Sequence, residues 1–304
     1  MPLRMRHWIW LMTWSRQQQG IAFSILAPLL YTLRSMAIKS APPIKTEQIV
    51  FLRFVFDFLI LVPFFFTARK KLSSQRLPLY FMRALCVVLC AWCSVYGITH
   101  LLLVDALLLE NTMGLFIPVI LWIWHRQKIS LASWLILFLG FSSLFFILKP
   151  KLNILHVAGF ASLATGLLSA ISTVAINTLS KTESPSTMFF YFNIFTGSIA
   201  VALCAYSWDG FPVLSISPTF WLPLLMNSLC GLLFQFTIIR AYSLISPHIV
   251  GSFAYFGILF SALFGYVLWN EPLDSIQIFG GMILIGSGLL IILENKRSTI
   301  SEKL

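Results

Sequence analysis

Apolar residues run through this chain in long blocks that short polar stretches separate. Each block holds roughly 18 to 25 mostly apolar residues, enough for a helix to cross about 30 Å of hydrocarbon. The pattern predicts ten membrane-spanning helices, at residues 18–38, 48–67, 78–98, 101–123, 130–148, 155–180, 187–206, 218–240, 246–268 and 275–293. The loops between them are too short to hold an extramembrane domain. The predicted fold class is an all-α polytopic membrane protein.

Composition and charge agree with this class. The 304 residues are 59% hydrophobic and 10% charged, whereas soluble domains have about a quarter charged residues. The net charge of +11 does not indicate nucleic-acid binding, because Lys and Arg concentrate on one side of the predicted membrane. That side has Arg4, Arg6, Arg16, Arg69, Lys70, Lys71, Arg76, Arg126, Lys128, Lys181, Lys296, Arg297 and Lys303, and the other has Lys39, Lys45, Lys149 and Lys151. The bias predicts an inner (plasma) membrane protein with both termini in the cytoplasm.

The N-terminal segment is short, basic and rich in Trp, which is typical of an interfacial segment rather than a cleaved signal peptide. All five cysteines lie within predicted spans, which disfavours a disulfide framework. The expected organisation is an interfacial segment at 1–17, a five-helix unit at 18–148, a second at 155–293 and a cytoplasmic tail at 294–304.

An internal repeat is indicated when the chain is shifted by 144 residues along itself. The shift aligns ILWIWHRQKISLASW (120–134) with FGYVLWNEPLDSIQIF (264–279), and it places Gln127 on Glu271 and Asn111 on Tyr255. A unit with an odd number of spans is inserted the opposite way round when repeated. Inverted repeats of this kind build many secondary transporters, with the binding site near mid-membrane where the repeats meet.

Several segments resemble the drug/metabolite transporter superfamily, in its ten-helix EamA-like branch. They are RFVFDFLILVPF (53–64), YGITH and ALLLENTMGLF (96–116), SKTESPSTMFFYFNIFTG (180–197) and, most strongly, 240–291 with Tyr255, Gly265 and Glu271. The resemblance implies two inverted five-helix units around a central cavity, and a carrier for small metabolites. The chain departs from the family pattern in its first half, where Gln127 replaces a Glu and Gly114 replaces a Pro, with Pro118 one turn later.

Glu110 is the most informative side chain, because it lies in the middle of the apolar run LLLENTMGLFIP (107–118). A charge there costs about 3 to more than 10 kcal/mol. Its face of span four, with Ala106, Gly114 and Pro118, is small and so packs against protein or lines a cavity. Two interpretations stay open: a titratable carboxylate that couples to or pairs with a cationic substrate, and a neutral or Arg-paired group that ties helices together.

Other polar and aromatic residues in the spans are candidates for the cavity. Arg53 and Asp57 are spaced for an ion pair on one helix face, a structural interpretation, with a gating or substrate-orienting role as the alternative. The cavity candidates besides Glu110 are Tyr31, Trp92, Tyr96, Asn111, Asn177, Gln235 and Tyr255. Trp92 and Tyr96 suit either ligand stacking or packing. The cysteine stripe of span three predicts close helix packing rather than a metal site, and Glu271 is interpreted as structural.

The sequence therefore predicts a secondary carrier that works by alternating access on a small cationic or zwitterionic metabolite, such as an amino acid or derivative, with proton or exchange coupling. S-adenosylmethionine uptake is the named alternative. The five histidines all lie at span ends or outside the spans and form no catalytic cluster, which disfavours an intramembrane enzyme, and no P-loop pattern is present. The expected partners are a small-molecule substrate and the lipid bilayer, without nucleic acid, metal or cofactor. Oligomeric state is not predicted.

Overall fold

The computed structural model describes residues 15–41, 44–67, 74, 76–126, 130–148, 157–206, 218–245, 247–271 and 274–301. Its first-half helices are α2 (Arg16–Lys39), α3 (Thr46–Thr67), α4 (Leu77–His100), α5 (Leu103–Glu110), α6 (Met113–His125) and α7 (Leu131–Leu148). The second half has α8 (Val157–Ser180), α9 (Pro185–Tyr206), α10 (Pro218–Leu244), α11 (Pro247–Ala254), α12 (Phe256–Trp269) and α13 (Ser275–Ser301). The helical fold class is confirmed, and α5 with α6 and α11 with α12 form the fourth and ninth spans.

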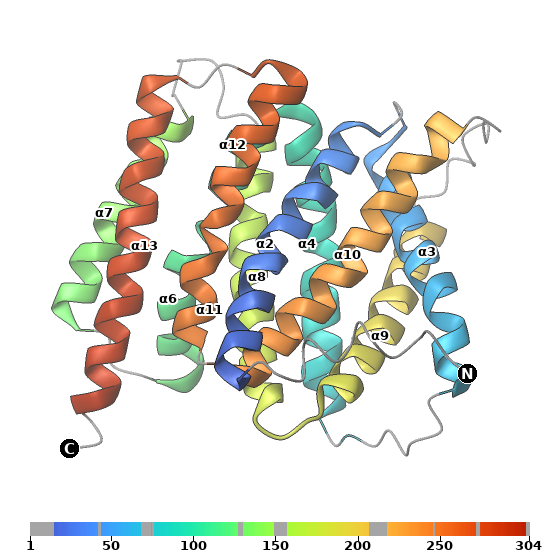
Figure 1. The fold of residues 1–304 in the computed structure, drawn as a ribbon, viewed down its shortest axis with the longest axis horizontal. Coiled ribbons are helices and arrows are strands. Elements are labelled where there is room, and N and C mark those ends of the chain that lie inside the picture. Colours follow the sequence, from blue (N-terminus) through green and yellow to red (C-terminus); the bar gives the residue numbers. More distant parts are fainter. Residues whose placement is uncertain are drawn as a thin grey trace.

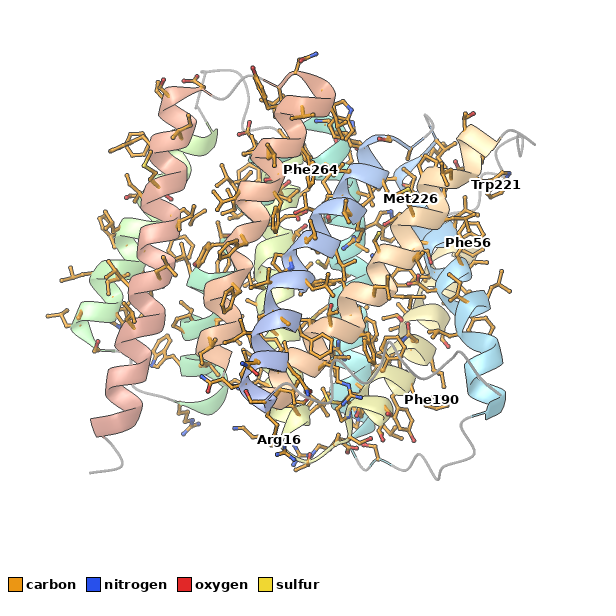
Figure 2. The ribbon with its side chains drawn as sticks, in the orientation of Figure 1. Arg16, Phe56, Phe190, Trp221, Met226 and Phe264 are labelled. Carbon is orange, nitrogen blue, oxygen red and sulfur yellow. The ribbon has the colours of Figure 1, made fainter. Side chains whose placement is uncertain are left out.

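The helices run roughly side by side in one bundle (Figure 1). Within the described residues, five are long and apolar enough to cross a membrane by themselves, at Arg16–Lys39, Leu77–His100, Leu103–Trp124, Val157–Ser180 and Thr219–Leu244. Large apolar side chains such as Ile123, Leu131 and Phe138 are exposed on the outside, at 68%, 77% and 77%. Aromatic side chains also project at the edge, where Phe56 on α3 lies beside Trp221 on α10 (Figure 2). This outer surface suits contact with lipid chains.

The two halves follow the same plan. Adding 144 to the bounds of the fourth span, Leu103 and His125, gives Pro247 and Trp269, the bounds of the ninth. Arg126 and Asn270, also 144 apart, are the residues with positive φ in the described chain, at 52° and 49°. Each ends its helix in the left-handed conformation that commonly terminates helices. The repeat prediction is thus matched by backbone detail.

The halves interlock across the bundle. In the most extensive contacts, α2 packs on α10, α4 on α8, and α7 on α13. The first two are the same contact under exchange of the repeats, since α2 corresponds to α8 and α4 to α10. The start of α2 and the end of α13 lie at the same end of the bundle (Figure 1), as an even number of crossings requires.

Small residues set the spacing where helices approach most closely. Cys90 Sγ on α4 lies 3.2 Å from Ser169 Oγ on α8, and a Cβ on Gly97 would overlap the Ser162 side chain. The cysteine stripe predicted on span three, which is α4, therefore packs against α8. Gly257 on α12 lets that helix approach α2, and its carbonyl accepts a hydrogen bond from Thr32 at 3.3 Å.

Replacing Gly288 with Ala should destabilise the bundle by about 1–3 kcal/mol, because overpacking a well-filled contact forces side chains or backbone to move. A Cβ at Gly288 on α13 would overlap the Tyr255 ring and hydroxyl. The matched control is Gly286→Ala, two residues earlier, where a Cβ meets nothing within 4 Å and Ala gains up to about 1 kcal/mol in helix propensity. Thermal unfolding in detergent measures both; equal melting temperatures would refute the close contact.

Candidate functional site

The fourth span breaks immediately after Glu110. Asn111 and Thr112 form a turn between α5 and α6, in which the Asn111 side chain donates to the Leu107 carbonyl at 2.7 Å and the Thr112 hydroxyl to the Leu109 carbonyl at 2.6 Å. Asn and Thr side chains compete in this way with helical backbone bonds. Pro118 does not cause the break, because α6 continues through that residue.

A glycine on α8 accommodates this break. A Cβ on Gly166 would meet the Leu109 carbonyl at 3.1 Å and the Glu110 carbonyl at 3.2 Å, and would overlap the Thr112 hydroxyl. The ninth span breaks at Tyr255, which separates α11 from α12. Discontinuous helices that correspond between two repeats mark the binding region in many transporters.

Glu110 is 5% exposed and contacts the first span through its side chain. Its Oε2 accepts a hydrogen bond from the Tyr31 hydroxyl on α2 at 2.6 Å. Its Oε1 and the Ser94 hydroxyl on α4 are both buried and lie near each other, although no well-formed hydrogen bond joins them. The structure thus brings together two predicted site residues, Glu110 and Tyr31, and within the described residues no Lys or Arg forms an ion pair with the Glu110 carboxylate.

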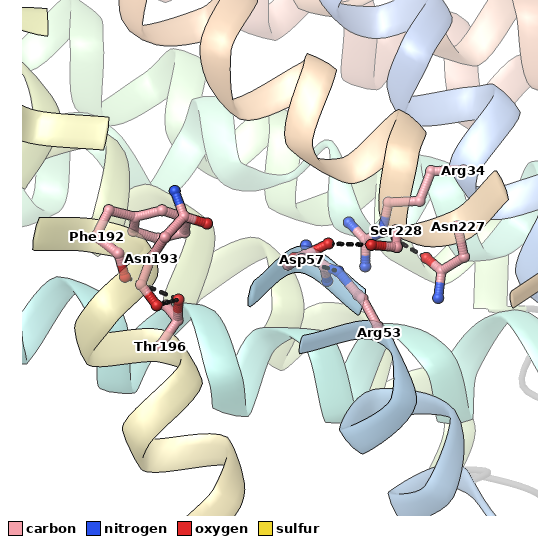
Figure 3. Close-up of polar contacts among 8 residues, drawn as sticks. All are labelled: Arg34, Arg53, Asp57, Phe192, Asn193, Thr196, Asn227 and Ser228. Atoms are coloured by element: carbon pink, nitrogen blue, oxygen red, sulfur yellow. Dashed lines mark hydrogen bonds and ion pairs between the residues drawn. The ribbon is translucent and has the colours of Figure 1, made fainter. Parts of the chain in front are cut away.

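Arg34 is a candidate site residue that the sequence reasoning missed. It is 5% exposed on α2, its guanidinium carbon lies 5.2 Å from the Tyr31 ring centroid, and its Nε donates to Asn227 Oδ1 on α10 at 3.4 Å (Figure 3). The signal was present, because an Arg within an apolar span is a functional candidate by default. Tyr31 therefore lies between a carboxylate at its hydroxyl and a guanidinium at its ring.

A second buried guanidinium lies against the same helix. Arg53 Nε on α3 is 3.8 Å from Asp57 Oδ2, and Asp57 also accepts a hydrogen bond from the Ser228 hydroxyl of α10 (Figure 3). A Cβ on Gly231 would lie 3.2 Å from Arg53 Nη2, so the absence of a side chain there lets the guanidinium rest on α10. Asp57 pairs with Arg53 and also lies near Arg34, which in turn lies near Glu110.

Glu271 forms contacts with two other helices, besides lying at the end of its own span. Its carboxylate forms an ion pair with Lys39 at the end of α2, and its Oε2 accepts from the Leu103 backbone N–H at the start of α5, at 2.9 Å. Gly265 provides the space, since a Cβ there would lie 2.9 Å from Glu271 Oε2. A carboxylate at a helix N-terminus is favourable. Glu271 therefore ties α2, α5 and the end of α12 together.

The remaining candidates lie in other surroundings. Tyr255 packs against α6 and α13, and a Cβ on Gly114 would lie 2.6 Å from its hydroxyl. Gln235 accepts from Arg83 Nη2 at 3.0 Å, and Tyr96 stacks on His100 with ring centroids 4.2 Å apart. Trp92 packs against an apolar cluster that α2, α3, α4, α5, α9 and α10 share, while Asn177 is partly exposed on α8. The structure does not bring these residues to Glu110, apart from its chain neighbour Asn111.

Two helical repeats, each with a broken fourth span, form an architecture that many membrane transporters share. The EamA-like transporter family model matches residues 18–149 and 157–293, once for each half. The chain belongs to the EamA-like transporter family, and it is a multi-pass membrane carrier of small metabolites rather than an enzyme.

Known proteins similar to this chain transport different solutes. The pseudopaline exporter CntI of Pseudomonas aeruginosa is 27% identical over 270 residues, which cover 88% of this chain and 94% of that protein. The S-adenosylmethionine uptake transporter of Rickettsia bellii is 24% identical, covering 84% and 87%. The riboflavin transporter of Vibrio cholerae is 22% identical, covering 93% and 90%. A solved crystal structure at 13% identity shares the fold, with a TM-score of 0.64 over 91% of this chain and 98% of that one.

Proposed function

We propose that this protein is a secondary carrier of a small zwitterionic metabolite, an amino acid or amino-acid derivative, across the inner membrane by alternating access. The arrangement of Glu110, Tyr31 and Arg34 carries the proposal. A buried carboxylate that no Lys or Arg of the described chain pairs with suits an ammonium or sulfonium group, and a buried guanidinium suits a carboxylate. The Tyr31 ring spaces the two charges and offers an aromatic surface between them.

S-adenosylmethionine is the second candidate within this class, because it carries a carboxylate, an ammonium and a sulfonium. It is also the solute named for the Rickettsia relatives. Glu110 would also serve as the coupling group, taking up a proton when the substrate cation leaves. In this scheme both termini lie in the cytoplasm, on the side that the Lys and Arg bias indicates.

A thermal-shift series on purified protein tests the zwitterion requirement, since a ligand that binds the folded state alone raises the melting temperature. The probes are methionine, its amide without the carboxylate, N-acetylmethionine without the ammonium, and S-adenosylmethionine beside S-adenosylhomocysteine, which lacks the sulfonium. A complete zwitterion is expected to bind at least about tenfold more tightly than either truncated form. Equal shifts from all probes, or none, would contradict the proposal.

The same series on Arg34→Gln separates the two ends of the site. The variant should lose the preference for methionine over its amide and keep the preference over N-acetylmethionine, because Glu110 is intact. Arg240→Gln is the matched control, since Arg240 is exposed on α10. Because the relatives include both an exporter and uptake transporters, flux of any stabilising solute should be measured in both directions in proteoliposomes.

A further inference from the structure

Three buried arginines from three successive helices meet one face of α10. Arg34 of α2 contacts Asn227, Arg53 of α3 rests on Gly231, and Arg83 of α4 contacts Gln235. The three α10 positions are spaced by four residues, so they lie above one another on one face, each about 6 Å further along the helix axis. The guanidinium groups therefore form a row along α10.

Arg83 is the least satisfied member of this row. It is 0% exposed, and its Nε and Nη1 have no hydrogen-bond partner in the described chain, while Nη2 donates to Gln235. No carboxylate within the described residues forms an ion pair with it, whereas Arg53 pairs with Asp57. A buried guanidinium without a counter-charge is costly, and the Gln235 amide oxygen supplies no negative charge.

The groups around Arg83 favour an anion. Its guanidinium carbon lies 4.2 Å from the Phe192 ring centroid on α9, a cation–π contact. Tyr80, one turn earlier on α4, is also 0% exposed, and its hydroxyl makes no well-formed hydrogen bond among the described residues, although Ser74 and Glu183 lie near it. The Nε and Nη1 hydrogens of Arg83 and this hydroxyl are thus available in one buried region. A carboxylate, with two charged acceptor oxygens, matches this donor set.

We propose that Arg83 and Gln235, with Tyr80, form a second carboxylate-binding site, one turn along α10 from Arg53. Since it rests on the proposed carrier function, the inference narrows the substrate class to amino-acid derivatives with at least two carboxylates. One carboxylate binds at Arg34 and Arg53, and the other binds at Arg83. The ammonium group is then left to Glu110.

Thermal shifts of the full-length protein with acetate, glutarate and chloride test this site without the ammonium group. Glutarate should stabilise the wild type at lower concentration than acetate, because it engages two sites, and Arg83→Gln should weaken glutarate binding at least about tenfold. Arg240→Gln, which removes an exposed charge from α10, should leave glutarate binding unchanged. Chloride as effective as glutarate, or glutarate binding unaltered in Arg83→Gln, would overturn the assignment.

Gln235→Glu keeps the test decisive if Arg83→Gln fails to fold. The introduced carboxylate lies where the Gln235 amide already contacts Arg83, so it should pair with Arg83 in place of a ligand carboxylate. The variant should melt at a higher temperature than the wild type without ligand and lose the advantage of glutarate over acetate. A retained advantage would overturn the proposal. Because glutarate lacks an ammonium group, failure here is distinct from failure of the zwitterion series.

Discussion

Glu110→Gln is expected to abolish transport of a zwitterionic substrate while leaving folded protein in the membrane. The amide still accepts the Tyr31 hydrogen bond but offers no negative charge to the substrate cation. Losing one partner of a buried charge pair costs about 2–5 kcal/mol, which corresponds to roughly 30-fold or more in affinity. Flux in proteoliposomes, with and without a pH gradient, measures the loss.

Two variants serve as controls for Glu110→Gln. Tyr31→Phe removes one hydrogen bond and keeps the charge, so it should weaken binding by about 0.5–1.5 kcal/mol. Glu183→Gln neutralises a carboxylate between α8 and α9, where Glu183 accepts from Ser74, and should leave flux unchanged. If Glu110→Gln kept wild-type flux and pH dependence, Glu110 would be a structural tie between α5 and α2 instead.

Glu271→Gln is expected to cause the largest loss of stability, about 3–5 kcal/mol, because it leaves the Lys39 ammonium without its counter-charge in a mostly buried place. The Lys39 and Glu271 side chains are 16% and 6% exposed. The substitution also weakens the acceptor for the Leu103 N–H at the start of α5. Thermal unfolding of the purified protein should show a clearly lower melting temperature.

A double variant identifies the cause of this loss. Lys39→Met with Glu271→Gln removes both charges, so it should be more stable than Glu271→Gln alone. Asp274→Asn, three residues away, keeps an oxygen for the Ile276 N–H and should change stability little. A Glu271→Gln protein as stable as Asp274→Asn would show that the Lys39 ion pair contributes nothing.

The positions of the helices could be predicted from hydropathy, because each spanning helix needs about 20 mostly apolar residues to cross the bilayer. The breaks in the fourth and ninth spans could not, since apolar residues continue on both sides of Asn111, Thr112 and Tyr255. Their effect depends on side chains that bond back to the helix and on neighbours such as Gly166. The hydropathy pattern of one span does not show which residues of other helices, such as Gly166 on α8, will pack against it.

The site was predictable to the extent that single residues are unusual. Glu110 could be recognised because a carboxylate within the apolar run LLLENTMGLF is unusual. Tyr31, which was also predicted as a site residue, is its hydrogen-bond partner. Gln235, by contrast, was expected in the cavity because an amide in lipid needs a partner, and its partner Arg83 is 152 positions away in sequence. Pairings across repeats depend on tertiary packing, so spacing within one helix cannot reveal them.

The Glu271 contact also makes the two ends of the molecule chemically unequal. At its repeat-related position the chain has Gln127, which carries no charge, and Pro247 stands where Leu103 supplies its N–H. Proline has no N–H to donate, so the second repeat cannot reproduce this bond at the opposite end. If the carrier works by the proposed alternating access, opening its two ends disrupts different interactions, and we expect this difference to bias the inward-open and outward-open populations of the empty carrier.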